Sequence, residues 1–145
     1  MGAATAITEA RTDPRVQALA LDSMHTRLSY QFEQRLIHAG HPPYPGTWAI
    51  FLGARIRTGQ DLGSADPTDA IVDLAGRPLL VTHGTADDED LPERTEAFVA
   101  DATAAGLPVE LHWCEGAGHG LVDDVCPHDY ATWVRDFFTA ASTSP

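Results

Sequence analysis

The amino-acid sequence predicts an α/β fold with about three parallel strands and flanking helices. Three short, mostly apolar segments have the character of strands, at residues 16–22, 78–83 and 108–113. Helical patterns alternate with these strands along the chain, which is typical of βαβ units and therefore of a parallel sheet. Strands that are apolar along almost their whole length also indicate a sheet with both faces covered. The 145 residues suffice for one modest domain with a core, but not for two.

Each helix of the predicted fold has its own sequence signal. Residues 2–12 are small and compatible with a helix, which Asp13-Pro14 ends. Pro92 suits the first turn of a helix that runs to about residue 105, where a glycine follows. The last helix spans about 128–140, and its apolar stripe has the spacing i, i+3, i+4, i+7 and i+8. That stripe consists of Tyr130, Trp133, Val134, Phe137 and Phe138.

A helical insertion, at about residues 26–70, separates the first two strands. It contains two helical stretches, 26–40 and 47–57, with the proline-rich break 41–45 between them. The rest of the insertion is polar and rich in turn residues, and a short helical turn at 70–74 leads into the second strand. Both helical stretches carry enough apolar side chains to cover a pocket, so we expect a cap over part of the sheet.

Charge and composition narrow the class of partner. The formal net charge is −12, and all nine basic residues are arginines. A strongly acidic chain is repelled by nucleic acids and by anionic membrane surfaces. No apolar run approaches the roughly 20 residues that span a bilayer, and the first residues lack the basic segment of a signal peptide. We therefore expect neither a nucleic acid nor a membrane as partner.

The two cysteines, Cys114 and Cys126, allow three interpretations. No C-x-x-C pattern is present, so the usual scaffold of a structural zinc site is missing. We favour two free thiols, ahead of a disulfide that closes the loop between them. Zinc bound by both cysteines with His112 or His128 comes third, and we expect neither a metal nor a cofactor.

Two loops after predicted strands carry reactive side chains. Asp87 follows the strand 78–83, and His119 follows the strand 108–113. The carboxyl ends of parallel strands meet at one edge of a sheet, where functional loops gather. There a carboxylate can hold an imidazole in one tautomer and stabilise its protonated form, as a general base requires. Either residue alone would be an ordinary loop residue, and only the pair indicates catalysis.

These segments resemble parts of the α/β-hydrolases. Residues 77–87, RPLLVTHGTAD, resemble the family's acid-bearing strand and loop, and residues 116–119, GAGH, resemble its histidine loop. The 32 positions between Asp87 and His119 accommodate the one helix and one strand that the family places there. The resemblance covers most of the chain and is weakest over 26–70, where the family varies its cap. It implies the C-terminal portion of the fold, with the last three strands of an eight-stranded, mostly parallel sheet.

The first residues resemble the segment that follows the family's nucleophile. That nucleophile lies in a strained strand-to-helix turn with the pattern G-x-S-x-G. The segment MGAATAI, residues 1–7, resembles this turn entered one residue too late. The resemblance implies that Met1 lies directly after the serine and that its backbone N–H lines the oxyanion hole. We therefore expect the nucleophile immediately before Met1.

None of the residues in the chain replaces that serine. All five serines lack the flanking glycines of the turn: Ser23, Ser29, Ser64, Ser142 and Ser144. We expect Ser23 to be a polar residue at the end of a strand. Cys114 precedes the histidine loop by too few residues to act on the same imidazole.

The acid has a competitor at the next position. Family members place a proline four residues after the acid, and Pro92 lies five residues after Asp87 but four after Asp88. We favour Asp87, because the turn that leaves the strand fixes a carboxylate more tightly than the following helix does. The neighbouring Glu89 and Asp90 are expected to be solvated at a helix N-terminus, where negative charge suits the dipole.

The resemblance implies serine hydrolysis through an acyl-enzyme, with His119 moving the proton and Asp87 orienting His119. We expect an ester as substrate first and a peptide second, because serine peptidases of the prolyl oligopeptidase kind end in similar strands and loops. The competing interpretation is an inactive truncated chain, or a folded half that acts as an interaction module. We expect no ester hydrolysis by the isolated chain.

Overall fold

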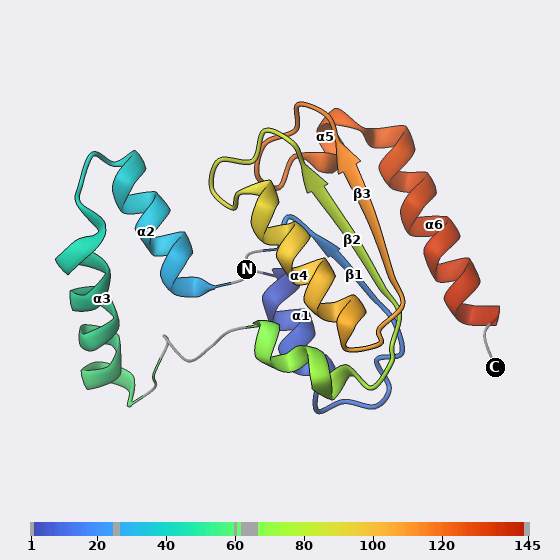
Figure 1. Cartoon of the computed structure of the whole chain (residues 1–145), viewed down its shortest axis with the longest axis horizontal. Coiled ribbons are helices and arrows are strands. Elements are labelled where there is room, and N and C mark those ends of the chain that lie inside the picture. The colour runs from blue at the N-terminus through green and yellow to red at the C-terminus, as the bar shows by residue number, and fades with distance from the viewer. Residues whose placement is uncertain (1, 25–26, 60, 62–66, 144–145) are drawn as a thin grey trace.

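The computed structural model describes residues 2–24, 27–59, 61 and 67–143, and its centre is a parallel sheet in the order β1-β2-β3 (Figure 1). The elements in chain order are α1 (Gly2–Ala10), β1 (Leu19–Asp22), α2 (Leu28–His38), α3 (Pro43–Thr58), the 3-10 helix η2 (Pro67–Leu74), β2 (Leu79–Gly84), α4 (Pro92–Ala104), β3 (Val109–Cys114), α5 (Val122–Val125) and α6 (Pro127–Thr143). This is the partial α/β-hydrolase fold that the sequence predicts. The three predicted strands and the parallel arrangement are confirmed.

Strand β2 is the centre of the sheet, and all six of its residues are buried. It pairs with β1 through Leu19 opposite Leu79, and with β3 through Leu79 opposite Val109. The last pair of β2 and β3 joins Gly84 to Cys114. Because the strands are parallel and in this register, the loops that follow β2 and β3 leave the sheet at the same edge.

Helices cover both faces of the sheet. Alternate β2 residues, Leu79 and Val81, belong to a core that includes side chains from α1, η2 and α4, among them the buried Phe98. Leu80 points to the other face, since side chains alternate along a strand, and it is fully buried. Helix α6 contacts β2, with Phe137 buried, and covers that other face (Figure 1). Two covered faces explain why the strands are apolar along most of their length.

Helices α2 and α3 form a helical pair beside the α/β unit (Figure 1). The two helices meet through Phe32 and Phe51, whose rings pack edge to face at 5.6 Å between centroids. The guanidinium of Arg94 on α4 lies 3.2 Å above the Tyr30 ring, and this contact connects α2 to the main unit. Among the described helices, none is long and apolar enough to cross a membrane.

The predicted element boundaries shift where local hydrogen bonds form. The strand predicted from residue 16 begins at Leu19, because the Val16 amide donates to the Asp13 carbonyl and closes a turn. The second helix of the insertion begins earlier than residue 47, at Pro43, and has a kink at Tyr44. The short helix α5 was not predicted, since four residues give no periodicity to read.

Candidate active site

The loops after β2 and β3 are joined to each other by backbone hydrogen bonds. The Thr85 amide donates to the Cys114 carbonyl at 3.0 Å, and the Ala86 amide donates to the Ala117 carbonyl at 3.0 Å. In the other direction, the Gly116 amide donates to the Thr85 hydroxyl at 2.9 Å. These bonds continue the pairing of β2 and β3 beyond the strands. The two loops therefore form one connected layer at the carboxyl edge of the sheet.

Gly84 permits this close approach. A Cβ atom at Gly84 would lie 2.1 Å from the Ala117 carbonyl oxygen, a distance that no side chain tolerates. The obstacle is backbone and cannot rotate away. A glycine at the end of β2 is thus a geometric requirement for placing the acid loop against the histidine loop.

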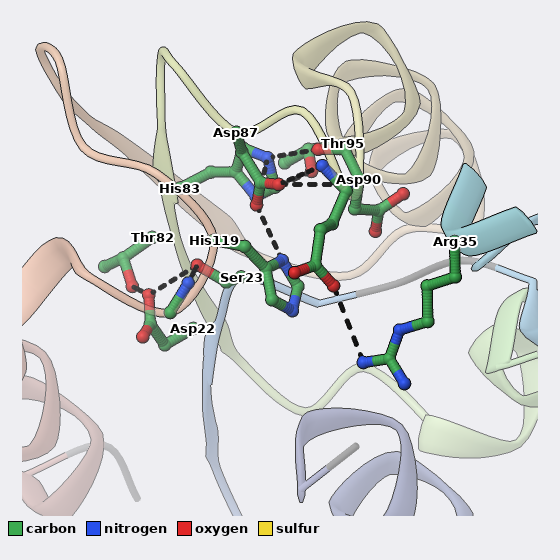
Figure 2. Close-up of polar contacts among 11 residues, drawn as sticks. Asp22, Ser23, Arg35, Thr82, His83, Asp87, Asp90, Thr95 and His119 are labelled. Carbon is green, nitrogen blue, oxygen red and sulfur yellow. Dashed lines mark hydrogen bonds and ion pairs between the residues drawn. The ribbon is translucent and has the colours of Figure 1, made fainter. Parts of the chain in front are cut away.

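Asp87 and His119 meet within this layer (Figure 2). His119 Nδ1 and Asp87 Oδ2 are 2.8 Å apart, and the Asp87 side chain is fully buried while that of His119 is 21% exposed. The other Asp87 oxygen, Oδ1, accepts from the Glu89 amide at 3.0 Å and from the Asp90 amide at 2.9 Å. Both carboxylate oxygens are thus engaged, which fixes the orientation of Asp87. Because Nδ1 faces Asp87, Nε2 of the imidazole is turned away from it.

The electrostatics of the pair favour its charged form. Burial raises the pKa of Asp87, but hydrogen bonds from His119 and from the Asp90 amide, together with the charge of His119, leave that pKa below its ordinary value. The hydrogen bond to Asp87 raises the pKa of His119 above its ordinary value, against the opposing effect of burial. A carboxylate that stays ionised beside an imidazole that readily takes a proton is the combination that a general base needs.

His83, a residue that the sequence does not mark as functional, lies beside Asp87 (Figure 2). Its Nε2 lies 2.9 Å from the Asp90 carbonyl oxygen and 3.4 Å from Asp87 Oδ2. A carbonyl can only accept, so we assign the proton to Nε2, and Nδ1 then accepts from the Thr95 hydroxyl at 3.1 Å. The ring is completely buried. A histidine inside an apolar strand gives no sequence signal beyond its position four residues before the acid.

The acids that follow Asp87 have separate environments. Asp88, the alternative acid, has an 80% exposed side chain that lies 3.8 Å from His38 on α2, and His119 pairs with Asp87. Glu89 lies 3.5 Å from Arg35 on α2. Asp90 is buried, with 1% of its surface exposed, so the expectation that it is solvated is wrong. The reason is the turn at Asp87, which draws the Asp90 backbone inward between Asp87 and His83.

Ser23 lies at the end of β1, as expected, but it also contacts the histidine loop (Figure 2). The Gly120 amide donates to Ser23 Oγ at 3.0 Å. Ser23 Oγ lies 3.4 Å from Asp22 Oδ1, which also accepts from the Thr82 hydroxyl at 2.9 Å. Burial raises the pKa of Asp22, and this outweighs the opposing effect of the Thr82 hydrogen bond.

The two cysteines form a disulfide, so the preference for free thiols is wrong. Cys114 ends β3 and Cys126 follows α5, and their Cα atoms are 6.0 Å apart. The chain between them turns back through α5, which brings the sulfurs together within the usual Cα spacing of a disulfide. Neither sulfur is available to a metal. Across the described part of the chain, no group of three or more His, Cys, Asp and Glu side chains is placed to hold a metal ion.

Some predicted site residues lie elsewhere or outside the described residues. Met1, the expected oxyanion-hole residue, is outside them, as are Ser64 and Ser144. Ser29 is on α2, and the hydroxyl of Ser142 on α6 donates to the Phe138 carbonyl. The structure thus brings together Asp87 and His119, and it adds His83 and Ser23 around them.

Comparison with known proteins gives one family match in sequence. The model of the prolyl oligopeptidase family, Peptidase_S9, matches residues 19–143. The match includes all three strands and both loops of the candidate site. None of the curated protein sequences matches the chain.

Solved structures with the same fold include esterases and peptidases. An esterase from Pyrococcus furiosus is 18% identical, with a TM-score of 0.72 over 95% of this chain and 50% of that one. An acylaminoacyl peptidase from Pyrococcus horikoshii is 14% identical, with a TM-score of 0.66 over 95% and 22%. An esterase from Thermogutta terrifontis is 22% identical, with a TM-score of 0.56 over 88% and 43%. The chain spans half or less of each of these proteins, and the likeness shows the fold.

Proposed function

The chain belongs to the prolyl oligopeptidase family of α/β-hydrolases, and on that premise we propose that Asp87 and His119 are the acid and base of a serine hydrolase. The observation that carries the proposal is the 2.8 Å contact between Asp87 Oδ2 and His119 Nδ1. Its position after two neighbouring parallel strands is where α/β folds hold their functional loops. The raised pKa of His119 and the lowered pKa of Asp87 agree with these roles.

In the proposed reaction, a serine Oγ attacks the acyl carbonyl while His119 Nε2 takes the hydroxyl proton. The C–O bond to the leaving group then breaks, and His119 returns the proton to the departing oxygen. Water hydrolyses the acyl-enzyme by the same two proton transfers. Asp87 accepts a hydrogen bond from Nδ1–H throughout, which keeps Nε2 free to act as base and stabilises the imidazolium.

We place the serine nucleophile outside the 145 residues, directly before Met1. The support is the resemblance of residues 1–7 to the turn after G-x-S, in which Met1 would supply an oxyanion-hole amide. Ser23, which contacts the histidine loop, has its hydroxyl bonded to Gly120 and Asp22 and lacks the glycines of that turn.

An ester is the proposed substrate class, and helices α2 and α3 are the proposed cap. A small-molecule ester agrees with the acidic net charge and with the fold shared with two esterases. A peptide is the second candidate, favoured by the family match and by the fold shared with an acylaminoacyl peptidase. Kinetics on p-nitrophenyl butyrate and on a blocked aminoacyl p-nitroanilide would rank the two classes.

The isolated chain and an upstream-extended chain together test the proposal. We expect no ester turnover by the isolated chain and no labelling by a fluorophosphonate, and stoichiometric labelling of any residue would refute the placement of the serine. A polypeptide extended through the upstream reading frame should contain Gly-x-Ser and hydrolyse the ester. In that polypeptide, His119→Gln should lower kcat at least about a thousandfold. The matched control is His128→Gln on the exposed side of α6, which should leave kcat unchanged.

A further inference from the structure

The ends of β1 and β2 are linked to the histidine loop by a chain of side-chain hydrogen bonds (Figure 2). Thr82 on β2 donates to Asp22 Oδ1 at 2.9 Å, and Ser23 Oγ lies 3.4 Å from the same oxygen. Ser23 Oγ in turn accepts from the Gly120 amide at 3.0 Å. Gly120 directly follows His119, so the chain of bonds ends one residue from the imidazole.

Ser23 holds this position at a conformational cost. Its φ is +44°, in the left-handed region that residues with a Cβ rarely adopt. It is 5% exposed, so its hydroxyl sits away from bulk water and needs protein partners. Backbone strain of this kind persists only where the surroundings determine the conformation. Here the surroundings are the carboxylate on one side of the hydroxyl and the Gly120 amide on the other.

The geometry of these hydrogen bonds determines which groups donate and which accept. The Ser23 hydroxyl donates to Asp22 Oδ1, which leaves a lone pair on Ser23 Oγ to accept the hydrogen bond from the Gly120 N–H. Gly120 itself has a φ of +65°, so the loop turns sharply just after His119. Asp87 holds the imidazole from the side of β2, and Ser23 holds the following peptide from the side of β1. The two contacts together restrain the histidine at both its side chain and its backbone.

We propose that Ser23 is a positioning residue for His119, acting through the Gly120 amide. The inference rests on the proposed function for its catalytic meaning, because His119 is the proposed base. The geometric part can be tested on the 145-residue chain without any activity. Ser23 is neither the nucleophile nor a group that touches the reacting atoms.

Two substitutions of Ser23 separate positioning from simple stability. Ser23→Gly removes the hydroxyl and relieves the left-handed strain, whereas Ser23→Thr keeps a hydroxyl and adds a β-branch to that strain. If the hydroxyl positions His119, the glycine variant loses the restraint on His119 and the threonine variant retains it. If Ser23 serves stability alone, the glycine variant retains the restraint and the threonine variant weakens it, because glycine suits this backbone better than threonine.

NMR of the 145-residue chain measures the restraint at two sites, the His119 imidazole and the Gly120 amide. Imidazole ¹⁵N shifts of His119 report its tautomer and its titration midpoint, and hydrogen exchange reports protection of the Gly120 amide. The charged groups that face His119 are Asp87, Glu89 and Asp90, and none is changed by these substitutions. In Ser23→Gly we expect the midpoint to fall toward the ordinary histidine value and Gly120 exchange to accelerate roughly two- to tenfold. Ser23→Thr should stay close to the wild type in both.

Two results would overturn the inference. One is Ser23→Gly with an unchanged His119 titration and unchanged Gly120 exchange. Another needs no variant: a Gly120 amide in the wild-type chain that exchanges at the rate of an unprotected amide. Ser142→Ala on α6 is the control for loss of a serine hydroxyl and should change neither signal. If the upstream-extended polypeptide proves inactive while the NMR result holds, the proposed function fails and the positioning of His119 stands.

Discussion

Polar side chains are buried at the end of β2 and in the loop after it, whereas large apolar side chains are exposed on α3. In the first region, Asp87 and His83 are almost completely buried, and each has hydrogen-bond partners for its ring or carboxylate atoms. In the second region, Trp48 is 59% and Ile56 77% exposed. Burial of polar groups is tolerated only where hydrogen bonds replace water. The first region is therefore fixed by its bonds, while α3 contributes little burial of its own.

This difference indicates where stability and chemistry reside. The site is part of the α/β unit, held by the sheet register and by side chains that reach under the loops. The α2–α3 pair contacts that unit through a few side chains on α2, such as Tyr30 and Arg35. We infer that the geometry of Asp87 and His119 is independent of the pair to first order.

The largest contrast is expected from truncating one aromatic side chain in each region. Phe98 on α4 is 1% exposed within the core, and Phe98→Ala should lower the free energy of unfolding by about 3–5 kcal/mol. Trp48→Ala on α3 should lower it by less than about 1 kcal/mol, because most of that side chain already contacts water. Urea unfolding followed by circular dichroism measures both values. Equal losses would show that the two regions share one core.

The sequence predicts only part of the contrast between the buried polar site and the exposed apolar face of α3. The three strands follow from apolar runs, and the closeness of Asp87 to His119 follows from two loops that leave parallel strands at one edge. Their catalytic roles stay predictions. The apolar residues of the insertion were predicted to cover a pocket, and many of them are exposed in the described part of α3.

Interactions set by the path of a loop could not be predicted. The burial of Asp90 depends on the Asp87 turn, and the Ser23 contact joins residues 97 positions apart. The disulfide depends on α5 turning the chain back toward β3. In each case the residue types are unremarkable in sequence. These residues contact one another only because of the course of the backbone in three dimensions.

Reduction of the Cys114–Cys126 disulfide should have the next largest effect. The two cysteines are 12 positions apart and enclose His119, and closing a loop of that length stabilises a fold by about 3 kcal/mol in the chain-entropy model. We expect urea unfolding with reductant to show a loss of that order. The double variant Cys114→Ala/Cys126→Ala should show a similar loss without reductant and should not respond to it. If reductant also lowers the free energy of unfolding of the double variant, then something other than this disulfide responds to the reductant.

The ion pair at the site predicts a pH dependence of stability on the order of 1 kcal/mol. The lowered pKa of Asp87 adds stability that is present above its ordinary value of 3.8 and is lost as the pH falls through the folded value. The raised pKa of His119 adds stability that is present below its ordinary value of 6.5 and is lost as the pH rises through the folded value. The free energy of unfolding of the wild type should therefore exceed that of His119→Gln by the largest amount between pH 3.8 and pH 6.5.

Unfolding free energies of the wild type and His119→Gln at a series of pH values measure this window. The exposed His128 provides the control, because His128→Gln should track the wild type at each pH. A difference between wild type and His119→Gln that is constant from pH 3 to 9 would show that the imidazole contributes packing and no charge.

The smallest effect is expected where the two regions touch. Arg35 on α2 lies 3.5 Å from Glu89 beside the acid, and their side chains are 60% and 35% exposed. Exposed ion pairs of this kind contribute little, so a double-mutant cycle with Arg35→Ala and Glu89→Ala should give a coupling below about 0.5 kcal/mol. Salt should reduce it further, since the Arg35 guanidinium is largely exposed. A coupling well above 1 kcal/mol would mean that α2 is fixed to the acid loop. The helical pair would then belong to the site, and substitutions on α2 should also move the titration of His119.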